Sequence, residues 1–443
     1  MAKAKKTETA PPQAPASAQE QPIATQQPSV MGGGFISKPV LVLGLLVGLL
    51  SLAVDYLPTK ITPLEFTYEY APRTVEQQEL YSNGVGRVPN SAVFGSLERL
   101  LEGEALAPED LVVSPDGTKA FAGLRDGRIV YFANDKNGEL KMHDFGRTGN
   151  YRETCGEPSS EVFCGRPMGL AFVDGPSYDR YVLRIEDPTF FKESKMLLIV
   201  DAYKGLLLMD ATGKMTKVFD SVGPRRVKFL NSLAVAKDGS VYVTESSRRF
   251  HHNDVGLDIL ERQPTGRLLH FNPVTTRVTV LANDLAFPNG LALVDDEESL
   301  LIAMSFQNKI IKYKVKTKTI VDYAYVPGMP DNLSIEKTAD GKSTALFVGL
   351  TSIQQFWYPY VVGQPKVRKL LSLVLSSSQN YKLCSQRSAF ARLELTTGEI
   401  THVYQDTDGS ARFLSSVRAF GGHYYLLSGS RDNLVRIPKS AFT

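Results

Sequence analysis

Five oxygen-bearing side chains stand at the same point of a repeating sequence pattern, and their types suit a calcium site. They lie in the segments A-P-E-D, F-L-N-S, F-P-N-G and M-P-D-N and are Glu109, Asn231, Asn289, Asp331 and Asn332. Four apolar, strand-like stretches, such as LVVSPDG and GLALVDD, follow them directly. If the repeats are blades of a propeller, all five side chains face one axis. Two carboxylates and three amides are hard oxygen donors, which Ca²⁺ prefers.

The elements that would position these residues are short strands joined by D-G or N-G turns. Such turns between β-rich runs recur along the chain, and the repeated units begin at Leu111, Gly169, Ser232, Gly290, Leu333 and Ser415. Each unit has the strand and loop rhythm of a four-stranded blade. The sequence therefore predicts an all-β fold, a six-bladed β-propeller over residues 103–443, with residues 59–102 supplying a linker, a short helix and a closing strand.

Composition excludes several classes of protein. With 443 residues, 43% hydrophobic and 22% charged, the chain has the balance of a globular protein. Its net charge of +3 is close to neutral for this length, so nucleic acid is not an expected partner. The sequence lacks the H-E-x-x-H and G-x-S-x-G motifs, which disfavours a zinc hydrolase and an α/β-hydrolase triad.

The N-terminal region predicts a membrane anchor. Residues 1–37 are rich in Ala, Pro, Gln, Ser and Thr, which predicts a disordered cytosolic tail. An uncharged apolar run follows, and with its flanks it gives a transmembrane signal-anchor over residues 38–58. Lysines on its N-terminal side keep that end in the cytosol, which places the C-terminal domain in a lumen or outside the cell, at the plasma membrane or an endomembrane. The alternative is a cleaved signal peptide.

The cysteines fit an oxidising compartment. Cys155 and Cys164 lie nine residues apart in a polar loop containing Gly and Pro, and in a lumen this spacing predicts a local disulfide. Cys384 is left over and is expected to be a free thiol.

The longest insert lies within the fifth unit and contains a basic and apolar stretch, residues 366–375. Lys366, Arg368 and Lys369 precede an apolar run there. One interpretation is an interfacial helix that rests on the membrane. The other is a lid packed over one face of the propeller, which is compatible with membrane contact.

Several motifs together resemble a known family. The segments A-P-E-D, R-D-G-R-I-V, C-G-R-P-M-G-L, V-D-A-Y-K-G-L, F-P-N-G-L and P-G-M-P-D-N are similar to those of the strictosidine-synthase-like six-bladed propellers, whose wider kin are the paraoxonases and gluconolactonases. The resemblance covers roughly residues 38–440. It implies a single-pass type II membrane protein with a calcium-dependent, arylesterase-like propeller, in which the five residues above form the axial calcium site.

The resemblance also exposes departures from the family's chemistry. Met168 stands where paraoxonases place a catalytic His, and their partner His falls near Asp201 and Ala202. Ser415 or Ser416 stands near the position of the catalytic Glu of strictosidine synthase, which disfavours that activity. For a second, structural calcium, Asp110 is present, but Ser232 replaces an expected Asp.

If the chain hydrolyses esters, a base must activate water. Asp201 and Glu245 are the candidates by position near strand ends, with hydrogen-bonded structural carboxylates as the alternative. Tyr203 and Met168 are expected to line the substrate pocket, although simple packing fits Tyr203 equally well. His251 and His252 lie in a charged loop, where solvation is expected.

One sequon tests the calcium set. Asn332-Leu333-Ser334 is an N-x-S acceptor for a glycan, and a buried metal ligand cannot carry one. Asn and Asp also form turns, so each axial residue taken singly has a local explanation, whereas the set of five does not.

These observations predict a membrane-anchored, calcium-dependent hydrolase with arylesterase or lactonase activity on a small ester or lactone. The alternative is a non-catalytic, calcium-stabilised propeller that acts as a binding or scaffold module at the membrane.

Overall fold

Asx turns between successive strands determine where those strands end. Asp116 accepts a hydrogen bond from the backbone N–H of Thr118 at 3.0 Å, and Asp238 accepts one from Ser240 at 2.8 Å. Such side-chain bonds stabilise tight reversals, so each apolar run pairs with the next run along the chain. The computed structural model describes residues 53–65, 91–174, 178, 195–294, 297–338, 341–353, 363–379, 387–406 and 408–442.

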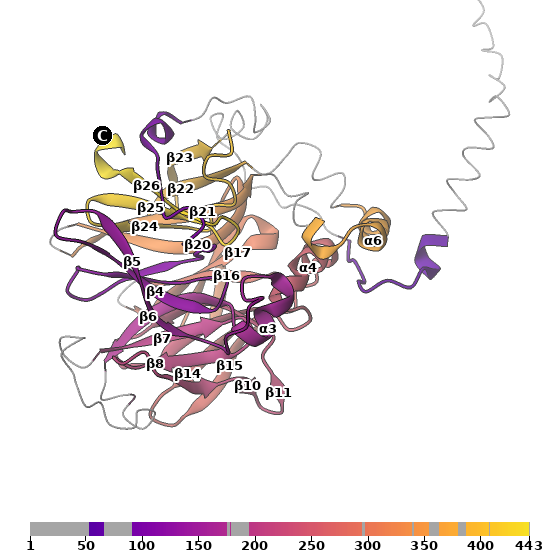
Figure 1. Ribbon diagram of the computed structural model, residues 1–443. Helices are drawn as coiled ribbons and strands as arrows, with labels where there is room; N and C mark the ends of the chain where they lie inside the picture. The colour runs from indigo at the N-terminus through magenta and orange to yellow at the C-terminus, as the bar shows by residue number, and fades with distance from the viewer. Residues whose placement is uncertain are drawn as a thin grey trace, which may run out of the picture. The chain divides into compact units, whose positions relative to one another are not determined.

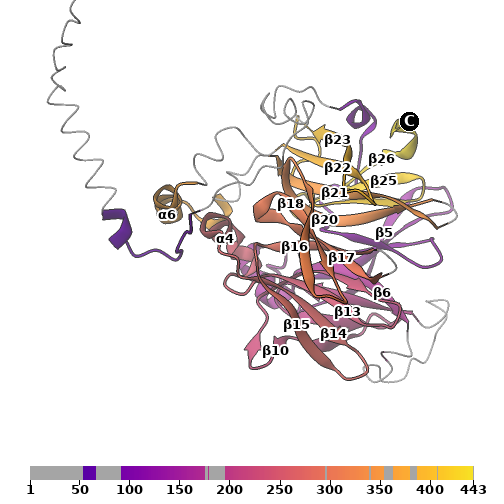
Figure 2. The ribbon, with the colours of Figure 1, turned by 180° about the vertical axis from the view of Figure 1, so that it is seen from behind.

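Most strands of the described residues form six four-stranded antiparallel sheets, which are the blades of a propeller (Figures 1 and 2). β10 (Ser221–Val222) and β11 (Arg225–Arg226) form a separate two-stranded sheet. Blade 1 contains β2 (Leu111–Val113), β3 (Ala120–Gly123), β4 (Arg128–Asn134) and β5 (Leu140–Arg147). Blade 2 contains β6 (Pro167–Asp174), β7 (Lys195–Asp201), β8 (Gly205–Met209) and β9 (Met215–Phe219). Blade 3 contains β12 (Phe229–Val235), β13 (Val241–Ser247), β14 (Gly266–Asn272) and β15 (Arg277–Leu285).

The remaining blades follow the same order. Blade 4 contains β16 (Pro288–Val294), β17 (Ser299–Met304), β18 (Lys309–Lys314) and β19 (Thr319–Tyr325). Blade 5 contains β20 (Gly328–Lys337), β21 (Ser343–Ile353), β22 (Ser388–Glu394) and β23 (Ile400–Asp406). Blade 6 contains β24 (Ser416–Phe420), β25 (His423–Leu427), β26 (Leu434–Pro438) and β1 (Glu98–Leu100). The all-β six-bladed propeller is therefore confirmed.

The ring closes by pairing the two ends of the domain. β1 runs antiparallel to β26, so the first strand of the described propeller completes the last blade. Arg436 donates to the Glu98 carboxylate at 2.7 Å across this pair. The short 3₁₀-helix η1 (Ala92–Ser96) precedes β1 and buries Val93 and Phe94. Closure leaves no exposed inner edge on the ring.

Apolar side chains fill the seams between adjacent blades. Strand after strand contributes fully buried residues, among them Phe121, Leu198, Val243, Leu301 and Phe390. The clusters lie between blades 1 and 2, 2 to 4, 4 and 5, 5 and 6, and 6 and 1. The blades thus bury both of their faces, which explains why many strands read as continuous apolar runs rather than alternating ones.

The first strand of four blades carries the same irregularity. From Pro288 to Leu291 the first strand advances three residues while its partner moves two, from Met304 to Ile302. The equivalent step occurs at Met168-Gly169, Asn231-Ser232 and Asp331-Asn332. A β-bulge re-aims its side chains, so each blade presents one residue pair differently from the rest of the strand.

A helical layer lies beside blades 3 and 5. α6 (Pro365–Val374) comes from the insert between β21 and β22 and packs beside α4 (Val255–Glu261), as Figures 1 and 2 both show. The Arg368 side chain is fully buried and donates to the carbonyls of Leu260 and Glu261 at 2.8 and 3.1 Å. A further hydrogen bond joins Arg368 to Leu64 of the N-terminal segment. α6, the described helix of the insert, is therefore held against α4 and the N-terminal segment.

The N-terminal predictions fall largely outside the described residues. Residues Val54–Thr443 form one compact unit, and of Met1–Ala53 only Ala53 is described. Within the described part, residues 53–56 are helical, and the described helices include none with the length and apolar character of a membrane span. Cys384 also lies outside the described residues.

Cys155 and Cys164 form the expected disulfide, with Cα atoms 5.7 Å apart. It brackets the 3₁₀-helix η2 (Pro158–Ser160) and the single-turn α3 (Glu161–Cys164). Cys164 is fully buried, so the bond ties an otherwise loop-like segment to the edge of the ring.

We expect the Cys155→Ser, Cys164→Ser double variant to lose about 2–3 kcal/mol of stability, because the closed loop is short. This loss should lower the melting temperature by about 3 °C for a domain of this size. Reductant should produce a similar decrease in the wild type and none in the double variant, measured by circular dichroism. An equal response of both proteins to reductant would contradict the structural role of this bond.

Candidate functional site

The bulges bring the five predicted calcium ligands together on the inner ring of strands. The first strands of adjacent blades contact one another around this ring. Each of the five side chains is no more than 6% exposed, and they are Glu109, Asn231, Asn289, Asp331 and Asn332. Glu109 lies two residues before the first residue of β2, while the other four occupy the bulges of β12, β16 and β20.

Hydrogen bonds from blade to blade connect these positions. The Thr244 hydroxyl of blade 3 donates to the carbonyl of Asn289 at 2.7 Å. The backbone N–H of Asn332 donates to the carbonyl of Ser415 at 2.9 Å, and the Ser415 hydroxyl donates to the carbonyl of Glu109 at 2.7 Å. A Cβ added to Gly290 would lie 2.5 Å from the carbonyl oxygen of Asp331, so this glycine is needed for the close approach of blades 4 and 5.

The side chains leave polar atoms that fit a cation. Asn231 Oδ1, Asn289 Oδ1 and Asp331 Oδ1 are buried and have no hydrogen-bond partner among the described residues. Buried oxygens without partners are costly, and three of them on one axis point to a bound cation. The Asn332 amide nitrogen is also buried without a hydrogen-bond partner among the described residues. Exchanging the positions of the amide oxygen and nitrogen of Asn332 would place its oxygen there instead.

The carboxylate groups on the axis also fit a cation-binding site. Burial raises the pKa of Asp331 well above its usual range, and the negative charges of Glu109 and Asp110 add to this effect. Burial also raises the pKa of Glu109, although Arg166 opposes the shift. Acidic groups crowded in a low dielectric need a positive charge to stay ionised. The described residues include no cluster of three or more His, Cys, Asp or Glu in metal-binding reach, so the amide oxygens are essential to such a site.

Sequence reasoning missed Arg166, which among the described residues is the one buried cation that forms a hydrogen bond with this set. Its side chain is fully buried and lies in the C-G-R-P-M-G loop. Its guanidinium donates to Glu109 Oε2 at 3.1 Å and to the carbonyls of Ala107 and Gly429 at 3.1 and 3.2 Å. Arg166 therefore fixes one carboxylate of the axial set and balances part of its charge.

The hydrogen bonds of Asp110 do not support a second calcium site at this residue. Both of its carboxylate oxygens accept hydrogen bonds from Arg418, at 2.7 and 2.6 Å, and Oδ1 also accepts one from Ser416. This bidentate pair neutralises Asp110. Ser232, the other position considered, receives the backbone N–H of Leu291 on its hydroxyl.

Burial of the sequon conflicts with its use. The side chain of Asn332 is 3% exposed and lies in the β20 bulge. A glycan needs an open approach to this nitrogen, which the folded ring does not offer. The glycan predicted from the sequon alone is therefore at odds with the place of Asn332 in the fold.

The predicted bases are held in structural hydrogen bonds. Asp201 is fully buried and accepts the backbone N–H groups of Tyr203 and Lys204 at 2.9 and 3.0 Å, which secures a turn. Burial raises the pKa of Asp201. Glu245 accepts a hydrogen bond from Lys228 at 2.9 Å and pairs with Arg267. These partners favour the structural alternative for both carboxylates.

The two residues expected in the pocket take different places. Met168 is 3% exposed and packs in the core shared by blades 2 to 4. Tyr203 is partly buried, stacks on His251 with ring centroids 5.4 Å apart, and donates to Glu161 Oε2 at 3.0 Å. Neither side chain is part of the cavity wall described next. Tyr203 reaches that wall indirectly, because its partner Glu161 belongs to it.

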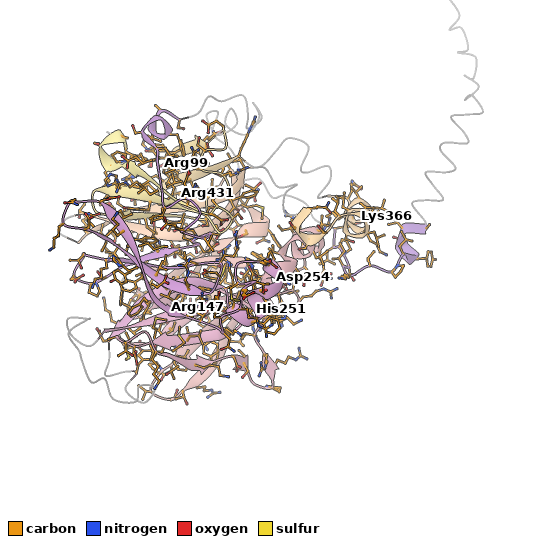
Figure 3. All side chains as sticks on the ribbon, in the orientation of Figure 1. Arg99, Arg147, His251, Asp254, Lys366 and Arg431 are labelled. Carbon is orange, nitrogen blue, oxygen red and sulfur yellow. A yellow bond between two sulfur atoms is a disulfide. The ribbon has the colours of Figure 1, made fainter. Side chains whose placement is uncertain are left out.

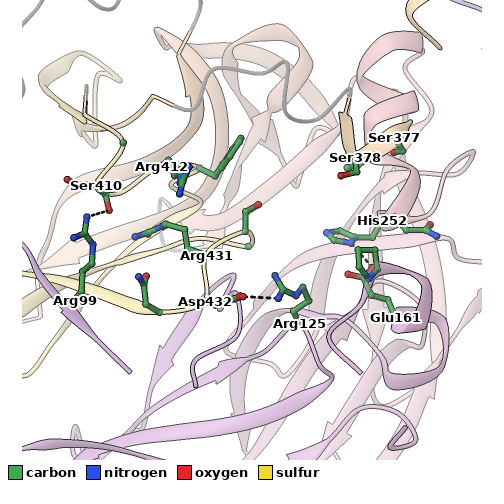
Figure 4. Close-up of a pocket in the computed structure, with 18 residues that line it drawn as sticks. Arg99, Arg125, Glu161, His252, Ser377, Ser378, Ser410, Arg412, Arg431 and Asp432 are labelled. Atoms are coloured by element: carbon green, nitrogen blue, oxygen red, sulfur yellow. Dashed lines mark hydrogen bonds and ion pairs between the residues drawn. The ribbon is translucent and has the colours of Figure 1, made fainter. Parts of the chain in front are cut away.

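A cavity of about 790 Å³ lies beside one residue of the axial set, Glu109, and Figure 4 shows the side chains that line it. Gly429 lines it, and a Cβ added to this glycine would lie 1.7 Å from Glu109 Oε2. The absence of a side chain at this point lets the cavity wall contact the axial carboxylate directly. The cavity is thus a route by which a small molecule could approach the axis.

A carboxylate–imidazole pair lies in the wall of this cavity, and it was not foreseen from the sequence. His252 Nδ1 lies 2.8 Å from Glu161 Oε2, and both residues line the cavity (Figure 4). Burial acts to raise the pKa of Glu161, but His252 and Arg166 outweigh it and hold that pKa below its usual range. The prediction of a solvated His252 is therefore wrong, because α3, some 90 residues earlier in the chain, supplies its partner.

The segment after α6 closes one side of the cavity. Ser377 and Ser378 line it, and Ser377 accepts a hydrogen bond from the backbone N–H of Gly256 at 3.0 Å. The lid interpretation of the insert fits this placement. α6 also carries three exposed apolar side chains, those of Val367, Leu373 and Val374.

Comparison with known proteins agrees with these features. Residues 231–318 match the strictosidine synthase family, and residues 90–132 match the strictosidine synthase-like N-terminal region. The adipocyte plasma membrane-associated proteins of Gallus gallus and Homo sapiens are each 28% identical, over 74% and 78% of this chain and the same shares of their own. The chain is therefore similar to strictosidine synthase-like proteins and to the adipocyte plasma membrane-associated proteins.

Further similar proteins agree with the propeller fold. Strictosidine synthase-like protein 3 of Arabidopsis thaliana is 29% identical over 63% of this chain and 68% of its own length. Among solved structures, a gluconolactonase from Xanthomonas campestris superposes with a TM-score of 0.50 at 13% identity, covering 80% of this chain and 96% of its own. That likeness concerns the propeller fold.

Replacement of Asp331 by Asn should have opposite effects with and without calcium. Without it, removal of a buried negative charge beside Glu109 should raise the melting temperature. With calcium present, the variant should lose most of the stabilisation that calcium gives the wild type, which is about 2.7 kcal/mol at a hundredfold excess over Kd.

Asn137→Ala, in an exposed turn, is the matched control and should respond to calcium as the wild type does. Scanning calorimetry in calcium and in chelator measures both effects. An Asp331→Asn protein with a full calcium response would remove Asp331 from the ligand set.

Proposed function

We propose that this protein is a membrane-anchored hydrolase of small esters or lactones whose axial site holds Ca²⁺. The observation that carries the proposal is the set of partnerless buried oxygens on the inner ring, together with Glu109, whose carboxylate lies directly behind Gly429 in the wall of the cavity that also contains the Glu161–His252 pair. Calcium, when bound, would polarise a substrate oxygen and stabilise negative charge on it. Its ligands would be Glu109, Asn231, Asn289, Asp331 and Asn332.

The Glu161–His252 pair supplies the base in this proposal. With Nδ1–H donated to the Glu161 carboxylate, Nε2 of His252 is left to accept a proton. Tyr203 donates to the same carboxylate oxygen, and Arg166 Nε lies 4.0 Å from the other. These partners fix the orientation of Glu161, and through it the tautomer of the imidazole. Asp201 and Glu245 lie outside the cavity wall, so His252 is preferred as the group that takes the proton from water.

Location at a membrane forms part of the proposal. It is supported by the apolar run over residues 38–58 and by relatives that are named for membrane association. Asp55, near the end of that run, lies 3.1 Å from Lys366 Nζ, and its carbonyl accepts from Lys369 at 2.8 Å. The exposed apolar face of α6 would then rest against the lipid surface. Figure 3 shows Lys366 on this helix.

A second function rests on Met168. This residue occupies the position where the paraoxonase resemblance implies a catalytic His, and it is packed in the core. A calcium-stabilised binding or scaffold module would need the axial site but no base. Strictosidine synthase activity is disfavoured, because Ser415 and Ser416 donate to Glu109 and Asp110 and offer no carboxylate.

Hydrolysis of phenyl acetate by the purified full chain in detergent tests the proposal. We expect turnover in calcium and a loss of at least about tenfold in chelator or in Asn289→Ala, because the metal stabilises charge that develops during reaction. Asn137→Ala is the matched control. Calcium-independent turnover would overturn the calcium mechanism, whereas no turnover with a calcium-dependent melting temperature would favour the binding module.

His252→Gln should lower kcat by about 100-fold or more, the usual contribution of a general base. KM should change little, and calcium should still raise the melting temperature. Glu161→Gln should lower kcat to a lesser degree, because it disturbs the tautomer rather than the base itself. His143→Gln, outside the cavity wall, serves as the control. An unchanged kcat in His252→Gln would remove this histidine from the mechanism.

A further inference from the structure

One wall of the cavity carries a buried guanidinium whose hydrogen-bonding capacity is largely unused. Arg431 lines the cavity and is 8% exposed. Its Nη2 donates to the carbonyl of Leu426 at 3.0 Å, but Nε and Nη1 have no partner among the residues that the structure describes. A guanidinium has five N–H donors in a fixed plane, and buried donors without acceptors are rare.

The surroundings of Arg431 are cationic. Arg99 and Arg412 lie in the same wall and lower the pKa of Arg431, while burial is the main cause of its fall to about 10. Asp406 is the nearby acid that opposes this shift, and its own oxygens accept the backbone N–H groups of Ser410 and Ala411 at 3.0 and 2.8 Å. Figure 4 shows the Arg431 guanidinium between those of Arg99 and Arg412.

Arg125 lines the same cavity and, in contrast to Arg431, has a structural role. It forms an ion pair with Asp432 at 3.0 Å and donates to the carbonyl of Gly156 at 2.8 Å. Its charge and donors are therefore used within the protein. Arg431 forms no ion pair of that kind within the described part of the chain, so packing alone does not explain why a cation is buried there.

We propose that this cavity is a binding site for an organic anion, whose carboxylate or phosphate group is held by Arg431 with Arg99 and Arg412 at the rim. The planar guanidinium matches the two oxygens of such a group. Nε and Nη1 each share one edge of the plane with Nη2, which carries a second N–H besides the one donated to Leu426, so either edge could bind the group in a bidentate manner. Exposed Arg99 and Arg412 would attract the anion into the cavity.

This site also narrows the substrate class. The same cavity contains the Glu161–His252 pair and reaches the axial set at Gly429. A molecule held by its negative group at Arg431 could present a second group to this region. The substrates would then be acidic esters or lactones, which bear a carboxylate or phosphate apart from the bond that is cut. Only this preference rests on the proposed function, because anion binding needs no catalysis.

Isothermal titration of the full chain in detergent, with succinate, inorganic phosphate and dimethyl succinate as probes, tests the anion site directly. We expect succinate or phosphate to bind, with affinity that falls as salt rises, and dimethyl succinate to bind at least tenfold more weakly. Comparison of the two anions tells a carboxylate site from a phosphate site. Equal binding of the neutral diester, or no binding of either anion, would overturn the proposal.

Variants locate the site. Arg431→Met should weaken binding of the preferred anion by about tenfold or more, since hydrogen bonds between charged groups are lost. Arg431→Lys should retain part of the affinity. Arg277→Gln, an exposed arginine of β15, is the matched control and should bind as the wild type does. Should Arg431→Met fail to fold by circular dichroism, the Arg99→Gln, Arg412→Gln double variant must still weaken binding several-fold. Unchanged affinity in these variants would refute the assignment.

The two proposals fail separately. Comparison of phenyl acetate with the monophenyl ester of succinic acid should show at least a tenfold higher kcat/KM for the acidic ester, and Arg431→Met should abolish that preference. Anion binding without hydrolysis of either ester would leave the site intact and reject the hydrolase. Hydrolysis without anion binding or charge preference would reject the site and leave the hydrolase intact.

Discussion

Buried negative charge on the propeller axis is the constraint on which the rest of the site depends. Glu109 and Asp331 are both buried, and burial raises the pKa of each; the charge of Glu109 raises the pKa of Asp331 further. Arg166 is the buried cation that contacts Glu109, and a single guanidinium does not balance two carboxylates. The surplus negative charge and the partnerless amide oxygens of Asn231 and Asn289 together favour a divalent cation of oxygen-preferring type.

The ring architecture separates these oxygen atoms from the apolar seams between the blades. A bulge at the same step of β12, β16 and β20 turns side chains toward the inner ring, where a strand with regular alternation would place them in the apolar seams. The seams supply the burial that stabilises the fold, while the axis collects polar groups that no seam could hold. A ligand from each of several blades would also join those blades, so binding and stability are coupled through the same residues.

The cavity is assembled from parts that are distant in sequence. The disulfide-bracketed turn brings Glu161, the loop after β13 brings His252, the segment after α6 brings Ser377, and the end of blade 6 brings Arg431. The two charged walls of the cavity differ in how far their polar groups are paired. The Glu161–His252 wall is internally paired, whereas the Arg431 wall keeps donors without partners. That asymmetry suits a ligand with one anionic end.

The sequence by itself determined the propeller and the axial residues, because both follow from local patterns. Turn residues at regular intervals set the strands, and Asn289 or Asp331 recurs at the same place in each repeat, so register in one blade implies register in the others. The Cys155–Cys164 bond was also predictable, since its partners lie close in the chain.

Only the tertiary structure decided which titratable groups meet in the cavity. Glu161 and His252 stand in unrelated loops with no shared motif, and Arg431 follows a turn that resembles many others. Asp201 and Glu245 had suitable positions near strand ends, but neighbouring backbone and side-chain donors engage them. Periodicity fixes what a strand presents to its own sheet, whereas contacts between loops depend on how the ring closes.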